Sequence, residues 1–155
     1  MIQRIQTVFL ILVTIFAGLF IVGDLFRFSG AANPEYLMNS RGIFQLAQDG
    51  VLNPELNTPV LFVLSLLLPL VSLLSVFLFK NRKLQMRILL FLLFIIFLLG
   101  TLTVFYGLVF ASQNLLKLSP QFELFIPVLN FVLVILAYRG VKKDDDLVRS
   151  YDRLR

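Results

Sequence analysis

The sequence contains no cysteine, no histidine and no tryptophan. Without cysteine, the chain can form no disulfide framework, no thiol redox motif and no thiolate metal site. Without histidine, it lacks the commonest metal ligand and the side chain that most often transfers protons near neutral pH. No glycine-rich phosphate loop, paired-carboxylate site or nucleophile–base pair is visible in the residues that remain. We therefore expect a protein that is not an enzyme and that holds no metal or cofactor.

Apolar residues are abundant instead: they make up 59% of the 155 residues, against roughly 45–50% in a typical soluble domain. They gather in four blocks, each close to the roughly 17–25 residues that a helix needs to cross a bilayer. Glu123, at the edge of the last block, is the only charged residue within them. We predict an all-α membrane protein, in which residues 1–155 form one integral membrane domain of four transmembrane helices in a small bundle. The expected spans are 7–23, 58–79, 88–110 and 122–138.

The basic residues are divided unequally between the two sides of this bundle. Arg4, four residues of the loop 80–87 and six residues of the tail 139–155 lie on one side. The other side carries Arg27, Arg41 and Lys117. Because basic residues in short flanking loops stay in the cytoplasm, we expect both termini to lie there. The basic residues that give the net charge of +5 lie beside the apolar spans, so we interpret them as orienting the chain in the lipid bilayer and expect no nucleic-acid partner.

The first apolar block also has a competing interpretation as a cleaved signal peptide. One basic residue precedes it, and small residues at 29–32 follow it. The apolar run is rather long for such a peptide, so we favour a retained span. Cleavage would leave three spans in the same final orientation.

The segment 24–57 is the only sizeable part expected outside the membrane on the far side. Asn33-Pro34 and Asn53-Pro54 predict turns within it. About 34 residues are too few for an independent core, so we expect a cap on the helix ends with a short strand or a helical turn. The segment 111–121 is a second, shorter connection, near which Lys117 and Glu123 could form an ion pair.

The tail 139–155 predicts a short amphipathic C-terminal helix. Its acidic run at 144–146 suits the start of a helix, and its late arginines suit the end. Apolar residues recur on one face of it, at Leu147, Val148, Tyr151 and Leu154. Such a helix either lies on the membrane surface or docks a cytoplasmic partner.

A stripe of small residues follows one face of the third span. Its members are Gly100, Thr103, Gly107 and Ala111. Small residues allow close approach between helices in lipid, where apolar burial does not drive association. We predict a helix–helix contact, with packing inside the chain favoured over a seam for self-association.

Asn130 is a strongly polar residue near the middle of the fourth span, three residues after Pro127. Pro127 and Pro69 each remove one helical hydrogen bond and are expected to kink their helices. Asn130 and Tyr106 are candidates for lining a small polar pocket. The alternative is that Asn130 forms a hydrogen bond between helices.

Three segments together resemble a family of small bacterial membrane proteins known as domain of unknown function 4293. They are the start Met1–Thr7, the loop Phe79–Arg87 and the ending Arg149–Arg155. The resemblance covers essentially the whole chain. It implies a location in the cytoplasmic (inner) membrane of a diderm bacterium, and it supplies no activity, cofactor or partner. All three segments fall on the expected cytoplasmic face.

Our leading hypothesis is a non-catalytic membrane subunit or scaffold that docks a larger membrane or cytoplasmic partner, or a second copy of the chain. The alternative is a small lipid- or quinone-binding protein with a pocket near Asn130. The expected partner-binding residues are all on the cytoplasmic face: Arg4, Arg82, Lys83, Gln85, Arg87, Arg149, Tyr151, Asp152, Arg153 and Arg155.

Overall fold

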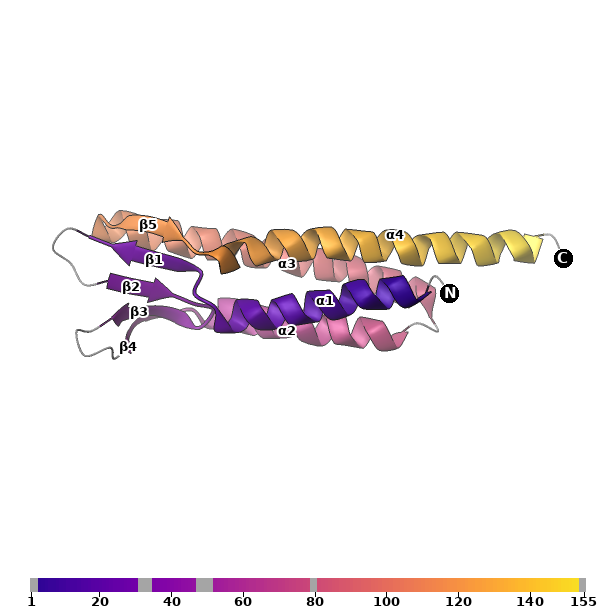
Figure 1. Cartoon of the computed structure of the whole chain (residues 1–155), viewed down its shortest axis with the longest axis horizontal. Coiled ribbons are helices and arrows are strands. Elements are labelled where there is room, and N and C mark those ends of the chain that lie inside the picture. Colours follow the sequence, from indigo (N-terminus) through magenta and orange to yellow (C-terminus); the bar gives the residue numbers. More distant parts are fainter. Residues whose placement is uncertain (1–2, 31–34, 47–51, 79–80, 154–155) are drawn as a thin grey trace.

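The computed structural model describes residues 3–30, 35–46, 52–78 and 81–153, which form four long helices and a five-stranded sheet (Figure 1). All four helices are long and apolar enough to cross a membrane. The helices are α1 (Gln3–Val22), α2 (Pro59–Phe77), α3 (Arg82–Asn114) and α4 (Ile126–Arg153), with a short 3-10 helix, η2 (Phe122–Phe125), leading into α4. The strands are β1 (Phe26–Ser29), β2 (Glu35–Met38), β3 (Gly42–Leu46), β4 (Leu52–Asn57) and β5 (Lys117–Pro120).

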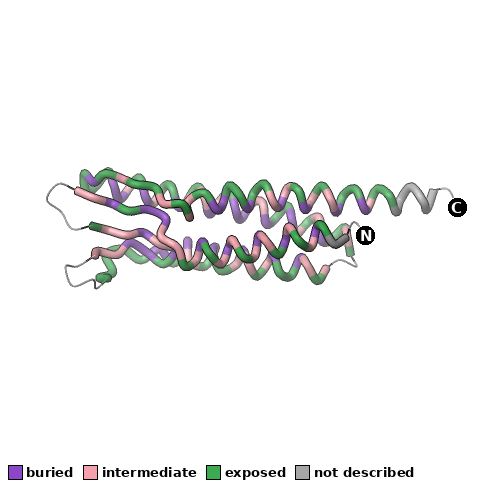
Figure 2. Tube along the Cα trace, in the orientation of Figure 1, coloured by how far each residue is buried: buried purple, intermediate pink, exposed green. Residues whose placement is uncertain are grey.

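The helices form a bundle in which α1 and α3 each pack against both α2 and α4. Fully buried side chains such as Leu10, Leu92 and Val134 fill its centre. Buried and exposed positions alternate around every helix (Figure 2). A polar contact also joins α1 to α2, because the Ser72 hydroxyl donates to the Leu10 carbonyl at 2.9 Å.

The sheet corrects the all-α prediction, which is wrong for the segments 24–57 and 111–121. Its strand order is β4-β3-β2-β1-β5, and every neighbouring pair is antiparallel. In β1, Phe26 and Phe28 are buried while Arg27 between them is exposed, which is the period of two that a half-buried strand requires. The fifth strand, β5, comes from the second connection and pairs with β1 across about 90 residues of sequence. A local sequence pattern cannot indicate a pairing between such distant segments.

The connections within the sheet differ from the predicted turns. Asn39 makes the turn between β2 and β3, where its side-chain oxygen accepts bonds from the Arg41 and Gly42 backbone N–H groups at 2.9 and 3.2 Å. Pro54 lies inside β4, opposite Phe44 and beside a bulge. Proline is tolerated there because β4 is an edge strand. Asn33 and Pro34 lie outside the described residues.

The sheet lies beyond the ends of α1 and α2, beside the last turns of α3 (Figure 1). With 33 residues, α3 is roughly 50 Å long, well beyond the roughly 30 Å of a bilayer core. Its extra length carries Phe110, whose ring meets Phe28 and Tyr36 edge-on at 5.2 and 5.4 Å. At the end of α1, the Ser40 hydroxyl donates to the Ile21 carbonyl at 3.0 Å. These contacts fasten the sheet to the helices.

The opposite end of the bundle holds both ends of the described chain (Figure 1). The predicted separate amphipathic tail helix is wrong, because α4 runs without a break from Ile126 to Arg153. Most of the expected loop 80–87 likewise belongs to α3, which begins at Arg82. Pro127 is the second residue of α4, a position where the backbone N–H has no intrahelical partner. The prediction that Pro127 kinks the fourth span is therefore wrong. Pro69 does lie inside α2.

Candidate functional site

A buried hydrogen bond joins the first helix to the last at the end of the bundle where the termini lie. The Gln6 amide nitrogen donates to Asp144 Oδ2 at 2.7 Å, and the two residues are 6% and 8% exposed. Gly140, one turn before Asp144, leaves room for the Gln6 side chain, since a Cβ there would stand 2.7 Å from Gln6 Cγ. This contact fixes the level of α4 against α1.

The start of α3 joins the same cluster, which we call the inner cluster and define as Gln6, Ser75, Arg82, Gln85 and Asp144. Arg82 Nη1 donates to the Asp144 backbone carbonyl at 2.9 Å. The Gln85 amide donates to the Ser75 carbonyl at 3.1 Å, closing the turn between α2 and α3. The inner cluster therefore ties all four helices together.

The inner cluster changes the roles of the predicted partner-binding residues. Gln85 is 4% exposed and is already bonded inside the chain, so it offers no surface to a partner. Arg82 is half-buried against α4, whereas Lys83 and Arg87 are exposed. Arg155 lies outside the described residues. The structure describes the backbone but not the side chains of the remaining five: Arg4, Arg149, Tyr151, Asp152 and Arg153.

A shallow groove of about 430 Å³ lies on the exposed face of α4, at the level of the buried Asp144. Three cationic side chains line it together with one acidic and one apolar side chain. They are Arg139, Lys142, Lys143, Asp146 and Leu147, and all five are exposed. From there the last turns of α4 run past the start of α1 along the same straight axis (Figure 1). We call this surface, from Arg139 to Arg153, the α4 extension.

The small-residue stripe of α3 packs inside the chain against two different elements. A Cβ at Gly100 would be in ordinary contact with Pro127 of α4 at 3.7 Å. One at Gly107 would stand 2.7 Å from the Phe26 ring of β1. Thr103 and Ala111, on the same face, are also buried. The stripe therefore contacts one helix and the sheet.

Asn130 and Tyr106 do not lie together. Gly100 and Pro127 mark one level of the antiparallel pair α3 and α4. From that level Tyr106 lies toward the sheet and Asn130 lies away from it, so they are separated by roughly 13 Å along the bundle. Asn130 is 1% exposed, and neither polar atom of its amide has a hydrogen-bond partner within the described part of the chain.

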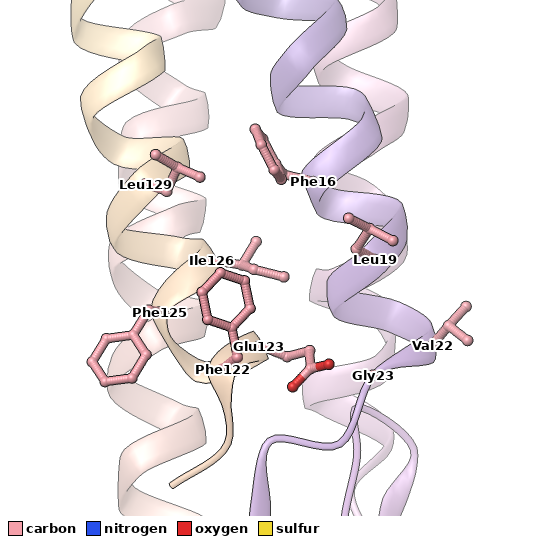
Figure 3. A pocket seen from close by; sticks show the side chains of 9 residues that line it. All are labelled: Phe16, Leu19, Val22, Gly23, Phe122, Glu123, Phe125, Ile126 and Leu129. Carbon is pink, nitrogen blue, oxygen red and sulfur yellow. The ribbon is translucent and has the colours of Figure 1, made fainter.

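A second groove, of about 450 Å³, opens between the sheet-side end of α1 and the start of α4 (Figure 3). Apolar side chains from both helices line it, and among the described residues that line it Glu123 alone is ionisable. The expected ion pair between Glu123 and Lys117 does not form among the described residues, where Lys117 lies on β5, paired with Ser29. Neither Asn130 nor Tyr106 lines this groove.

Sequence reasoning missed Gln6, Gly140 and Asp144. A signal was present, because Gln6 is an amide at the edge of an apolar span and Asp144 continues the helical register of the last span. Their pairing across 138 residues could not be read from one sequence. Within the described part of the chain, no three carboxylates gather as a metal site would require.

Comparison with protein-family models matches residues 2–154 to one family, which is described as domain of unknown function (DUF4293). No curated protein matches the chain.

Proposed function

The chain belongs to the family of domain of unknown function DUF4293, whose description names no activity, and from that premise we propose that it is a non-catalytic membrane subunit docking a larger partner through the α4 extension. The proposal places the protein in the cytoplasmic membrane of a bacterium, with the α4 extension in the cytoplasm. The supporting observations are the exposed apolar surface of the helices, the distribution of charge and the course of α4.

The outer surface of the bundle supports insertion into a bilayer. Large apolar side chains are exposed on every helix, which soluble monomers avoid over areas of more than a few hundred Å². Examples, each at least 53% exposed, are Val8, Leu70, Phe94, Phe97 and Val128. Among the described residues, most exposed basic side chains lie at the end of the bundle that holds the termini, on Lys83, Arg87 and the α4 groove. Basic residues that flank a span favour the cytoplasmic side.

The observation that carries the docking proposal is the straight course of α4. A helix that binds the membrane surface must lie in the plane of that surface. The α4 extension instead continues the axis of its span, and its last turns run beyond the start of α1 (Figure 1). This geometry favours the docking interpretation of the tail over the membrane-surface interpretation.

The chemistry of the α4 extension indicates the kind of partner. Leu147 is 42% exposed and begins the apolar face that the sequence continues through Val148, Tyr151 and Leu154. Arg139, Lys142 and Lys143 border this face. An apolar face bordered by cations complements an amphipathic helix that carries acidic residues beside its apolar side chains.

The proposal is tested by affinity purification of the tagged protein at native expression in mild detergent, followed by mass spectrometry of the bound proteins. Leu147→Asp should remove the partner, because a carboxylate would enter the apolar face. The matched control is Leu56→Asp on the exposed strand β4, since the two leucines are 42% and 41% exposed. That control should retain the partner.

Deletion of residues 148–155 gives the same test without touching Asp144 or its bond to Gln6. The partner should be lost while the truncated protein still inserts into membranes. Retention of the partner by both the deletion and Leu147→Asp would refute the proposal. Recovery of only further copies of this chain would replace the larger partner with a homo-oligomer and would also refute it.

A further inference from the structure

The groove beside Glu123 has the shape and chemistry of a binding site for an amphiphile. Its volume of about 450 Å³ lies in the range of roughly 300–1,000 Å³ typical of ligand sites. Phe16, Leu19 and Val22 line it from α1, and Phe122, Phe125, Ile126 and Leu129 line it from η2 and the start of α4, with Val22 and Phe125 pointing outward at its edges (Figure 3). Leu19, Phe125 and Leu129 are between 41% and 58% exposed, so the groove opens sideways toward the surroundings of the bundle.

Glu123 closes the sheet-side end of this apolar groove. Its side chain lies directly against Gly23, where an added Cβ would overlap Glu123 Cγ. Glycine at position 23 leaves room for this approach, and any larger side chain would require the Glu123 side chain to move. The carboxylate is half-buried and has no hydrogen-bond or ion-pair partner among the described residues.

The carboxylate of Glu123 is the group that a cation would complement. Two helix ends of opposite partial charge lie beside it. The last turn of α1 ends there, where the Gly23 N–H bonds to the Leu19 carbonyl, and Glu123 itself lies in the first turn of η2, which leads into α4. Because the negative end of α1 and the positive start of α4 offset each other, the full charge of the carboxylate dominates, and a positively charged group would complement it.

We propose that this groove binds a phospholipid whose headgroup carries a primary ammonium, with an acyl chain along the apolar walls and the ammonium on the Glu123 carboxylate. The proposal rests on the bilayer placement proposed above and is independent of the docking of a partner. At the sheet-side ends of α1 and α4 the groove meets the headgroup region, which is where an ammonium attached to an acyl chain would lie.

The test uses the full-length protein in detergent and measures retained lipid by native mass spectrometry. The probes are phosphatidylethanolamine, phosphatidylcholine and phosphatidylglycerol with identical acyl chains, offered in equal amounts. The wild-type protein should retain phosphatidylethanolamine about tenfold over phosphatidylglycerol, as expected for one charge-assisted hydrogen bond. Phosphatidylcholine should be retained less than phosphatidylethanolamine, because its trimethylammonium cannot donate a hydrogen bond.

Two variants separate the headgroup from the groove. Glu123→Gln keeps the shape of the side chain and should abolish the preference, whereas the control Glu55→Gln, on exposed β4, should keep it. Leu129→Trp should fill the groove and reduce retention of all three lipids.

Equal retention of the three lipids by the wild-type protein, or an unchanged preference in Glu123→Gln, would overturn the proposal. The proposal would also be overturned if the wild-type protein formed a dimer and Leu129→Trp dissociated it, because a second copy of the chain would then occupy the groove. Membrane extraction of the same variants tests bilayer placement separately, so failure of the two proposals can be told apart.

Discussion

The two ends of the molecule are built in different ways. At the sheet end, backbone pairing, aromatic contacts with Phe110 and side-chain bonds to helix ends close the structure on itself. At the other end, the inner cluster ties the helices with a few polar contacts, and α4 continues beyond them. The sheet end therefore pairs its strands with one another and leaves only the edges β4 and β5 open, while the inner end leaves Arg139, Lys142, Lys143 and Leu147 of α4 exposed. This difference is why we assign partner docking to the inner end.

The largest effect is expected from Gly42→Ala at the sheet end. A Cβ at Gly42 would overlap the backbone carbonyl oxygen of Leu56 on β4. That oxygen cannot move without disturbing the pairing of β3 with β4, so the free energy of unfolding should fall by about 2–3 kcal/mol. Unfolding in mixed detergent micelles measures the loss, and limited proteolysis locates it in β4.

Gly18→Ala is the matched control for this substitution, because a Cβ at Gly18 in α1 meets nothing within 4 Å. Alanine in a helix is favoured over glycine by roughly 1 kcal/mol, so this variant should be as stable as the wild type or slightly more so. Equal stability of Gly42→Ala and Gly18→Ala would show that the sheet end is not rigidly packed.

The second effect is at the inner end, where Asp144→Ala should lower the free energy of unfolding by about 2 kcal/mol. The substitution leaves the buried Gln6 amide without an acceptor, and an unmatched buried donor costs about 1–3 kcal/mol. The measurement is the same micellar unfolding assay. Asp144→Asn retains an oxygen for Gln6 and should recover most of the loss, whereas Asp146→Ala, at an exposed position, should change little. If asparagine proved as damaging as alanine, the charge of Asp144 and not its bond would be the important feature.

The helices were predictable from the sequence because a membrane span has a local signal, a long run of apolar residues. Each apolar block is long enough to define a helix without reference to the rest of the chain. The ends were less predictable: α3 extends from 82 to 114, beyond the expected 88–110, because its outer turns pack on the sheet. Polar residues at its start do not end the helix, since Asn81 caps it by accepting a bond from the Leu84 N–H.

The sheet and the inner cluster were not predictable for a common reason. Four-residue strands such as β1 and β2 carry little periodic signal, and the pairing of β1 with β5 joins segments far apart in sequence. The bond between Gln6 and Asp144 is equally remote. The expected partner-binding residues were chosen because they are polar and lie in segments expected on the cytoplasmic face, so Gln85 was assigned to a partner although the fold buries it.

Between the two ends, Asn130 tests whether a polar residue holds the middle of the bundle. Its amide is buried with both polar atoms unmatched within the described residues, so Asn130→Leu should raise the free energy of unfolding. The gain should be about 0.5–1 kcal/mol, the size of typical interhelical polar effects in membranes. A clear loss of stability in the micellar assay would instead show that Asn130 makes a hydrogen bond, through water or another group.

The smallest net change in the free energy of unfolding is expected from Gly140→Ala. This is the same glycine-to-alanine substitution as at Gly42, now made at the inner end. Here the new Cβ meets the Gln6 side chain at 2.7 Å, and that flexible side chain can move while the backbone stays in place. The helix gains roughly 1 kcal/mol from alanine and loses a similar amount as the Gln6 bond to Asp144 is displaced, so stability should change by less than about 0.5 kcal/mol. A double-mutant cycle reveals the hidden loss, because Asp144→Ala should cost less in the Gly140→Ala protein than in the wild type. An undiminished effect of Asp144→Ala would mean that the bond survives. The inner end would then be more loosely fitted than the sheet end, because it would accept a methyl group without losing its bond.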